Sequence, residues 1–282
     1  MMFIPEEAID RLLAEDVPYI DLTTWALGIG ERRGEIVYFT REDAVLCGTE
    51  EALRIMERLH IEADLSLPSG SGIKADEVFL RAYGRAADLH MAWKVCQNIF
   101  DHCSGIATKT RQMTRLARAV NPHVTIVATR KGFPGTKALA MKAVMAGGAF
   151  PHRLGLSETV LVFPQHMNFM GGLEGFITAA PDIKRHVCEK QLIVEARSVE
   201  DGVRLCLAGV DGVQFDKLPA GELAAAVPQL RAVNPHVVLL AAGGITEKNV
   251  AEYAQTGVDA LVTTNLFSAR PIDIGVRINA LE

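Results

Sequence analysis

The sequence lacks the features that mark disulfide-stabilised, membrane-spanning and exported proteins. Its 282 residues include only five cysteines, and no two stand in a CxxC spacing, so neither a disulfide framework nor a zinc site is predicted. No apolar run reaches the roughly eighteen residues that a transmembrane helix needs. The stretch MMFIPEEAIDRLLAED has no basic region followed by a long apolar run, so we expect no signal peptide. These absences favour a cytoplasmic protein with reduced cysteines.

Positive charge and aromatic side chains are also scarce. The net charge is −5, and the chain has only four tyrosines and two tryptophans. Binding to nucleic acid needs a basic face that neutralises phosphates, so nucleic acid is not an expected partner. Hydrophobic residues make up 49% of the chain, which is enough to bury a sizeable core in one large domain or two smaller ones.

The chain changes character near residue 104. Residues 1–103 mix helical and strand-like segments without regular alternation, which predicts an α+β domain. After that point, apolar strand-like runs alternate with amphipathic helices. The predicted strands are 124–130, 159–166, 192–197, 212–216, 237–244 and 260–265. Continuous apolar runs of this kind are typical of a parallel sheet covered on both faces, and six of them favour a compact or incomplete β/α barrel.

One heptapeptide, RAVNPHV, occurs twice, at 118–124 and 231–237. In each copy a helix is expected to stop at Asn-Pro, because proline cannot continue it, and the next strand follows. We therefore interpret His123 and His236 as turn residues and not as ligands.

Polar residues or glycines stand at the end of every predicted barrel strand. Chemistry in such barrels is located at the carboxyl ends of the strands, which all meet on one rim. A single charged strand end would be a solvated loop, but six on one rim predict a site. These ends are Arg130-Lys131, Gln165-His166, Glu195, Asp216-Lys217, Gly243-Gly244 and Thr263-Thr264.

An anionic ligand is predicted by two groups of these residues. The basic pairs Arg130-Lys131 and His152-Arg153 lie on consecutive loops. The segment AAGGITEKN places Gly243 and Gly244 after a strand and before a helix that we expect Thr246 to cap. Backbone N–H groups there can approach a phosphate closely, with further hydroxyl donors on the last strand at Thr263 and Thr264.

Glu195 and Asp216 end adjacent predicted strands. Neighbouring carboxylates repel each other unless a cation lies between them, so Mg²⁺ or sugar hydroxyls would suit them. The alternative is that they form structural ion pairs with Arg130 and Arg153, and the sequence leaves both readings open. A phosphate clamp, a Mg²⁺ site and four basic residues describe a polyphosphorylated sugar and an anionic acceptor, with no organic cofactor and no covalent nucleophile.

Several motifs resemble the quinolinate phosphoribosyltransferase family, whose members are also called nicotinate-nucleotide pyrophosphorylases. They are TRKGFPG, GGAFPHRLGLS, VDGVQFD and GGITEKNVAEYAQTGVDALVT, and the resemblance covers nearly the whole chain. It implies an N-terminal α+β domain at 1–103 and a type II phosphoribosyltransferase β/α barrel at 104–270. It also implies a C-terminal segment at 271–282 that packs back on the N-terminal domain. The implied substrates are phosphoribosyl pyrophosphate and an acidic nitrogen heterocycle.

The resemblance also implies a role for each matching residue. Arg130, His152 and Arg153 would hold the acceptor, and Lys131 would face the acceptor or the pyrophosphate. Glu195 and Asp216 would serve Mg²⁺ and the ribose, while Gly243, Gly244, Thr263 and Thr264 would hold the 5-phosphate. Family members are dimers or larger, with a basic residue of one subunit completing the neighbour's site, and that position falls on Lys94.

The chain departs from the family pattern at several of these positions. Trp93-Lys94 replaces a Glu-Arg pair, and lysine lacks the planar fork with which arginine binds a carboxylate. Phe163 stands where the family has a site lysine, and Lys217 where it has an asparagine. FPQH together with FDKLP is similar to the ModD branch, the pyrophosphorylases encoded with molybdate transport systems.

Three functions remain open on the sequence alone. The first is ModD-type transfer of phosphoribosyl to an acidic heterocycle. The second is an authentic, decarboxylating quinolinate phosphoribosyltransferase of NAD biosynthesis. The third is a non-catalytic anion-binding or sensor protein linked to molybdate uptake. Phe163 can stack on a flat ring but cannot neutralise a second carboxylate, so we expect a planar acceptor with less negative charge than quinolinate. Lys217 could restore that charge, although on an extended strand it would point away from Asp216.

Overall fold

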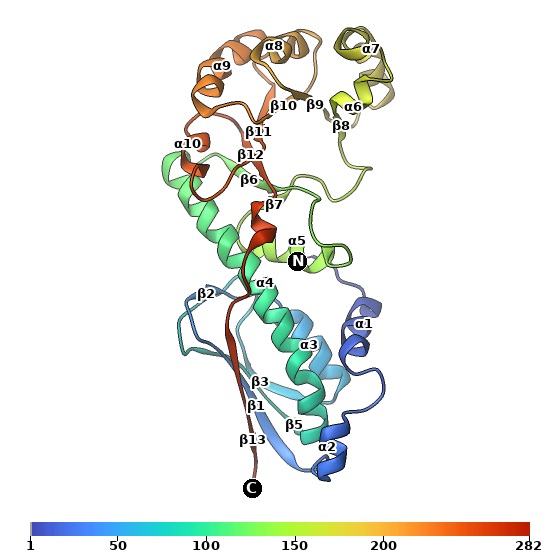
Figure 1. Cartoon of the computed structure of the whole chain (residues 1–282), viewed down its shortest axis with the longest axis vertical. Coiled ribbons are helices and arrows are strands. Elements are labelled where there is room, and N and C mark those ends of the chain that lie inside the picture. The colour runs from blue at the N-terminus through green and yellow to red at the C-terminus, as the bar shows by residue number, and fades with distance from the viewer. Residues whose placement is uncertain (1) are drawn as a thin grey trace. The chain divides into compact units, whose positions relative to one another are not determined.

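A computed structural model of the chain describes residues 2–282, which form two compact units (Figure 1). Unit 1 comprises the chain up to Arg111 together with Gly132–Gly148 and Leu266–Glu282. Unit 2 comprises Gln112–Lys131 and Ala149–Asn265. None of the described helices is long and apolar enough to cross a membrane. The domain division at 103 and 270 stays a prediction.

Unit 1 is built on a four-stranded antiparallel sheet in the order β13-β1-β5-β3. The strands are β1 (Arg33–Thr40), β3 (Glu62–Ser66), β5 (Val78–Arg85) and β13 (Ile274–Ala280). A separate pair is formed by β2 (Ala44–Val45) and β4 (Gly72–Ile73). The last strand, β13, pairs with β1 from Gly34↔Ala280 to Thr40↔Ile274, so the end of the chain completes the sheet that its beginning starts.

The core of unit 1 contains an aromatic cluster beneath this sheet. The rings of Tyr38 and Phe79 each meet Phe100 edge-on, with centroids 5.3 and 5.0 Å apart respectively. All three side chains are fully buried. The helices of the unit are α1 (Glu6–Asp16), α2 (Leu22–Leu27), α3 (Thr49–Arg58), α5 (Lys137–Ala146) and most of α4 (Ala86–Val120).

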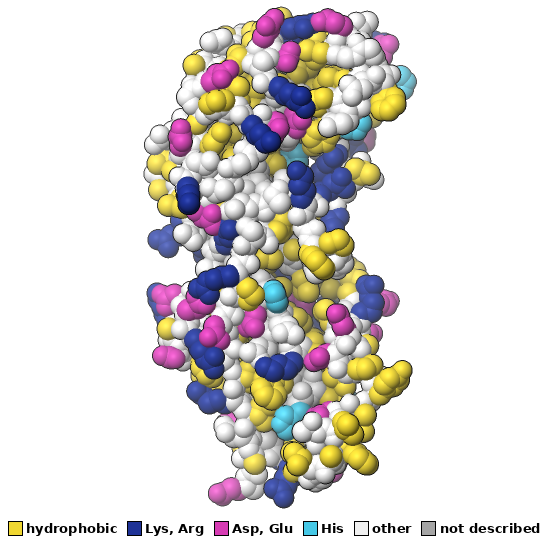
Figure 2. Space-filling model, in the orientation of Figure 1, with side chains coloured by type: hydrophobic (Ala, Val, Ile, Leu, Met, Phe, Trp, Pro, Cys, Tyr) yellow, Lys and Arg dark blue, Asp and Glu magenta, His cyan; other side chains and the backbone are white. Residues whose placement is uncertain are grey.

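Two features of unit 1 have consequences for function and stability. Large apolar side chains remain exposed on α2 and the residues before it, including Tyr19, Leu22, Trp25 and Leu27 (Figure 2).

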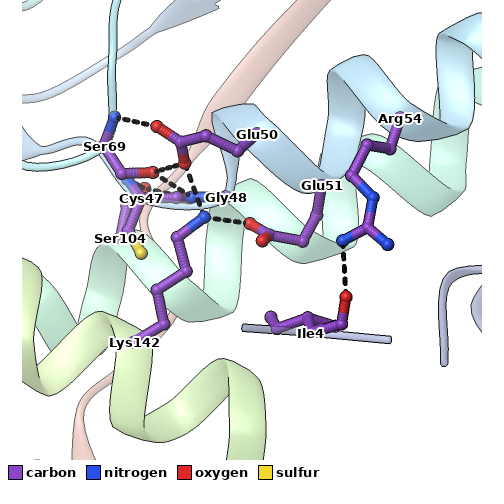
Figure 3. Close-up of polar contacts among 9 residues, drawn as sticks. All are labelled: Ile4, Cys47, Gly48, Glu50, Glu51, Arg54, Ser69, Ser104 and Lys142. Atoms are coloured by element: carbon purple, nitrogen blue, oxygen red, sulfur yellow. Dashed lines mark hydrogen bonds and ion pairs between the residues drawn. The ribbon is translucent and has the colours of Figure 1, made fainter. Parts of the chain in front are cut away.

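In contrast, the Lys142 ammonium on α5 is buried and makes ion pairs with Glu50, at 2.5 Å, and with Glu51 (Figure 3). These ion pairs fix α5 to α3.

Unit 2 is a parallel sheet of seven described strands in the order β7-β6-β12-β11-β10-β9-β8. The strands are β6 (Thr125–Ala128), β7 (Phe150–Pro151), β8 (Val160–Val162), β9 (Leu192–Ala196), β10 (Gly212–Asp216), β11 (Val238–Ala242) and β12 (Ala260–Thr263). The helices are α6 (Pro164–Met167), α7 (Gly172–His186), α8 (Val199–Leu207), α9 (Ala220–Val233) and α10 (Val250–Ala254), and a 3₁₀ turn at Asn265–Ser268 leads from unit 2 back into unit 1. Because β7 and β8 end the order without pairing to each other, the barrel is open. The predicted parallel β/α barrel is confirmed, and of the two forms left open by the sequence it has the incomplete one.

The structure corrects several predicted boundaries in unit 2. The strand expected at 159–166 covers only Val160–Val162, because Pro164 begins a helical turn that cannot belong to the strand. The short strand Phe150–Pro151 was not predicted. The helix after the paired glycines begins at Val250, so Thr246 is not its cap. Thr246 instead accepts a hydrogen bond from the Lys248 backbone N–H (3.3 Å) within the preceding turn.

The two copies of RAVNPHV adopt the same local structure. The backbone N–H of His123 donates to Asn121 Oδ1 at 3.0 Å, and that of His236 donates to Asn234 Oδ1 at 3.2 Å. Both histidines lie in turns after a helix, as predicted.

Candidate active site

Alternate residues of the parallel strands form one buried apolar cluster, which marks the inner face of the open barrel. Its members are Val127, Leu161, Ile193, Leu240, Ala242, Ala260 and Val262, and Phe163 packs against them. Side chains two positions apart point to the same face of a strand. Thr129, Glu195 and Thr264 each follow a member of this cluster by two residues, so the inner face becomes polar at the carboxyl ends of the strands.

Glu195 is the central acid of this rim. It is half-buried, and its Oε2 accepts a hydrogen bond from Gln214 Nε2 at 3.2 Å. Burial and the neighbouring Asp216 carboxylate raise its pKa, while Gln214, Arg197 and Lys131 act in the opposite direction. Glu195 therefore lies within electrostatic reach of both Asp216 and Lys131.

The two carboxylates make no structural ion pair with the predicted arginines. Among residues 2–282, no salt bridge joins Glu195 or Asp216 to Arg130 or Arg153. A carboxylate whose pKa is raised by burial and by a neighbouring carboxylate marks a place that suits a cation. No group of three or more His, Cys, Asp or Glu side chains in that part of the chain could hold a metal alone. The arrangement fits Mg²⁺, which is commonly held by one or two carboxylates plus substrate phosphates.

The paired glycines form a tight loop directly after β11. Gly243 and Gly244 both have left-handed backbones, with φ of +87° and +73°. A β-carbon on Gly243 would stand 2.6 Å from Asp216 Oδ1 and 2.5 Å from Lys217 Cγ. The loop backbone is therefore packed against Asp216 and Lys217.

Lys217 is oriented differently from the sequence-based expectation. Its φ is +60°, and its backbone N–H donates to the Ala242 carbonyl at 2.8 Å. The argument that Lys217 continues an extended strand and points away from Asp216 is therefore wrong, because the strand ends at Asp216 and the next residue is left-handed. The Lys217 stem lies beside the same glycine as the Asp216 carboxylate.

The two threonines after β12 have different partners. Thr263 is buried, and its hydroxyl donates to the Ile245 carbonyl at 2.7 Å, which holds the paired-glycine loop against β12. The Thr264 hydroxyl is 2.9 Å from that of Thr129, and Thr129 Oγ1 also accepts from the Lys131 backbone N–H at 3.3 Å. Thr263 thus shapes the loop, while Thr264 lies at the inner rim.

The predicted basic residues gather at β6 and β7. Arg130 and Lys131 are exposed directly after β6, and the His152 backbone N–H donates to the Ala128 carbonyl at 2.9 Å. Burial and nearby Arg153 lower the pKa of His152, and burial and nearby Arg130 lower the pKa of Arg153. His152 Nε2 is buried and has no hydrogen-bond partner within residues 2–282. Arg130 and Arg153 carry like charges close to each other, and the His152 ring nitrogen beside them is unpaired, so this group is suited to binding an anion.

A pocket of about 370 Å³ opens beside this basic group, with Arg153, Leu161 and His166 among its lining residues. Phe163 lies between β8 and α6, where its backbone N–H donates to His166 Nδ1 at 2.9 Å. The two rings lie 5.9 Å apart at 31°. An aromatic face and a cationic group therefore occur near the same strand end.

Lys94 belongs to α4 in unit 1, whereas the other predicted site residues belong to unit 2. Its ammonium lies 4.7 Å from the centre of the Trp93 ring and donates to Gln97 Oε1 at 3.0 Å.

Two rim residues were missed by the sequence analysis. Thr129 contacts Thr264, and Gln214 contacts Glu195. Each precedes the polar residue that the sequence analysis selected at its own strand end, so neither was chosen. A glutamine within the buried run GVQFD was the available signal, because a buried polar side chain in an apolar strand needs a partner.

Comparisons with known proteins agree with this architecture. The family model "Quinolinate phosphoribosyl transferase, C-terminal domain" matches residues 106–277, and the corresponding N-terminal domain model matches residues 21–104. Among solved structures, NadC from Streptococcus pyogenes has a TM-score of 0.90 at 20% identity and covers 98% of this chain and 97% of its own. The nicotinate-nucleotide pyrophosphorylase of Ehrlichia chaffeensis has a TM-score of 0.89 at 25% identity, covering 99% and 100%.

Curated relatives match over almost the full length. A protein of Escherichia coli O157:H7 described as "Putative pyrophosphorylase ModD" is 35% identical, covering 98% of this chain and 97% of its own. One of the same description from Rhodobacter capsulatus is 38% identical, covering 91% and 98%. A "Probable nicotinate-nucleotide pyrophosphorylase" of Methanothermobacter thermautotrophicus is 31% identical, covering 98% and 99%. The chain therefore belongs to the quinolinate phosphoribosyltransferase family and is an enzyme of the phosphoribosyltransferase class.

Proposed function

We propose that this enzyme transfers a 5-phosphoribosyl group from phosphoribosyl pyrophosphate to a planar, acidic nitrogen heterocycle, as a pyrophosphorylase of the ModD type in the cytoplasm. The bond from ribose C1 to pyrophosphate breaks, and the pyrophosphate leaves with the electron pair. The ring nitrogen's lone pair forms the new bond to C1. The observation that carries this proposal is the meeting of a glycine anion loop and two carboxylates on one barrel rim.

The donor is held by the second half of the rim. The Gly243 and Gly244 backbone and the Thr264 hydroxyl bind the 5-phosphate, and Thr263 keeps the loop in shape. Glu195 and Asp216 would hold the ribose hydroxyls and a Mg²⁺ ion, which would supply positive charge to stabilise the leaving pyrophosphate, so no organic cofactor is needed. Lys131, within electrostatic reach of Glu195, stabilises the leaving pyrophosphate.

The acceptor is held by the first half of the rim. Arg130, His152 and Arg153 bind its acidic group, and Phe163 stacks on its ring. An authentic quinolinate phosphoribosyltransferase is the second candidate, because Lys217 lies against Gly243 and could supply the cation that Phe163 lacks.

Calorimetry tests the donor half directly. Phosphoribosyl pyrophosphate with Mg²⁺ should bind saturably to the wild type, and removing Mg²⁺ should weaken binding. Glu195→Gln or Asp216→Asn should reduce that dependence on Mg²⁺. Absence of saturable binding with Mg²⁺ present would refute the proposal. Once binding is established, product formation across a set of heterocyclic acids, followed by mass spectrometry, identifies the acceptor, and complementation of a quinolinate auxotroph tests the second candidate.

A homodimer or larger assembly, with Lys94 reaching a neighbouring site, is part of the proposal. The exposed apolar side chains of α2 support it, since large exposed apolar patches are commonly interfaces. Mixing inactive Lys94→Ala and Lys131→Ala proteins should restore part of the activity, because one site in a mixed dimer would then have both lysines. A mixture as inactive as its components would contradict a shared site.

A further inference from the structure

Gln214 carries an unused hydrogen-bond acceptor in the interior of the rim. The side chain is only 5% exposed, and its Nε2 donates to Glu195 Oε2 at 3.2 Å. Its carbonyl oxygen, Oε1, is buried and has no partner among the described residues. A buried carbonyl without a hydrogen bond costs free energy, so its retention indicates a partner that binds later.

The neighbours of Gln214 place it on the inner face of the barrel, next to the carboxylate that we propose binds the ribose. Its cross-strand neighbours are Glu195 on β9 and Leu240 on β11. Leu240 belongs to the inner-face cluster against which Phe163 packs. The wall around Gln214 therefore combines apolar side chains with a neutral hydrogen-bond acceptor.

The orientation of the amide follows from Glu195. An ionised carboxylate only accepts hydrogen bonds, so the amide must turn its NH₂ toward Glu195, and its carbonyl is left over.

We infer that Gln214 determines acceptor specificity: its carbonyl accepts a hydrogen bond from a neutral donor group on the heterocycle. The acceptor class is then an acidic nitrogen heterocycle that also carries an amino, hydroxyl or ring N–H group. This inference rests on the proposed phosphoribosyl transfer. Sites that hydrogen-bond a substrate group reject analogues without it strongly, because the site's own polar group stays unpaired.

Matched pairs of pyridine carboxylic acids test the inference. Each pair carries an amino or a methyl substituent at the same ring position, so size is similar and only the amino member donates. With phosphoribosyl pyrophosphate and Mg²⁺, the wild type should prefer the amino member of at least one pair by roughly 10²-fold in kcat/KM. Gln214→Met keeps the length of the side chain without its amide and should reduce that ratio to a few-fold. Gln214→Leu serves if the methionine variant folds poorly.

Controls separate this role from two others. If Gln214 only orients Glu195, Gln214→Met will slow both members of each pair equally and leave the ratio unchanged, which overturns the inference. Gln229→Met, on the exposed face of α9, should change neither rate nor ratio. Binding of phosphoribosyl pyrophosphate is measured first. If it does not bind, the proposed function is refuted, and the inference about Gln214 is not what failed. If the donor binds but no pair is turned over, calorimetry of the same pairs gives the ratio as Kd values. A wild-type ratio near one, or no binding of any amino member, overturns the inference.

Discussion

Gly243 and Asp216 are packed so closely that a side chain on the glycine would collide with the carboxylate. An added β-carbon would stand 2.6 Å from Asp216 Oδ1, closer than real contacts of this kind. The left-handed backbone of Gly243, with φ of +87°, is a second and independent reason for glycine. Gly244 shares only the second reason, because no other atom comes within 4 Å of its β-carbon position. Comparing alanine substitutions at Gly243 and Gly244 therefore separates the effect of backbone strain from the effect of crowding.

Gly243→Ala and Gly244→Ala should differ in donor binding. Both alanines meet left-handed strain of about 1 kcal/mol, but only Gly243→Ala displaces Asp216 and the loop that binds phosphate. We expect the affinity for phosphoribosyl pyrophosphate to fall at least 10-fold further in Gly243→Ala than in Gly244→Ala, as measured by calorimetry. Gly221→Ala, in helix α9 with open space around it, is the neutral control. Equal affinities in the two loop variants would show that crowding by Asp216 is unimportant.

Lys131→Ala should reduce turnover without destabilising the fold. The side chain is exposed after β6, and no salt bridge ties it to another described residue. Removing one preorganised charge from a reacting site typically costs roughly 10² in rate. We expect that loss in kcat with the melting temperature nearly unchanged. A large drop in melting temperature with full activity would instead assign Lys131 a structural role.

The parallel β/α barrel could be predicted because apolar runs and helices alternate over long, regular segments, but whether it closes could not. It missed β7, since the two residues Phe150 and Pro151 are too short to show any period. Lys217 was misjudged for a related reason. The pattern indicates where an apolar strand ends, but the left-handed turn that follows depends on packing against Gly243, which no local pattern records.

The rim itself was only partly predictable. Looking for polar residues at the predicted strand ends found Glu195 and Asp216, which lie near each other. It missed Gln214, which joins the rim through alternation and cross-strand register, and Thr129, which joins it through its contact with Thr264. Such neighbours depend on which strands pair, and the order of strands is a tertiary property.

Asp101→Asn should stabilise the protein above neutral pH. Burial, with a smaller contribution from Asp273, raises the pKa of Asp101 to about 6. A folded-state pKa above the ordinary value of about 3.8 means that stability is fully present below that value and is lost as the pH rises through about 6. The asparagine keeps the Oδ1 acceptor for the Ile274 N–H but has no charge to bury. Because Asp101 is only half-buried, we expect a gain of about 1 kcal/mol at pH 8.

The gain from Asp101→Asn should shrink toward pH 4, as thermal or urea unfolding at both pH values can show. Asp64 provides a control of opposite sign, because its hydrogen bond with Arg81 lowers the pKa of its carboxyl group. Asp64→Asn should therefore not stabilise the protein at pH 8. An Asp101→Asn effect that is the same at both pH values would rule out the charge as its cause.

Lys142→Met should destabilise the fold strongly. Lys142 is only 7% exposed, and among residues 2–282 its ammonium is the only ion-pair partner of the buried Glu51 carboxylate. Breaking a buried ion pair by removing one partner costs about 3–5 kcal/mol, because the other charge remains buried. Urea unfolding should show that loss, and adding Glu51→Gln should recover part of it. Lys74→Met, which breaks the exposed pair with Asp43, should change the unfolding free energy little. A similar small effect of Lys142→Met would mean that the pair is not desolvated.

Phe163→Lys tests what excludes quinolinate. The ring packs on the inner-face cluster near β8, where it can stack on a heterocycle but cannot neutralise a second carboxylate. If the ring is the cause, Phe163→Lys should raise kcat/KM for quinolinate by about tenfold or more, in keeping with one added charged hydrogen bond. Phe163→Leu removes the ring without adding a cation and is the matched control. It should weaken the natural acceptor and leave quinolinate unused.

Lys217 provides the competing explanation, and its observed conformation strengthens it. The side chain runs beside Gly243 together with the Asp216 carboxylate, so its ammonium can reach the rim from a strand different from the one that carries Phe163. If the cation has moved there, the wild type already uses quinolinate and Lys217→Asn abolishes that use. The acceptor would then carry two carboxylates, and the argument from Phe163 would be wrong. We expect the opposite result, because Asp216 lies beside Lys217 at the same glycine and a carboxylate there competes with the substrate for the ammonium. Quinolinate turnover should therefore be weak in the wild type, rise in Phe163→Lys, and persist in the double variant with Lys217→Asn.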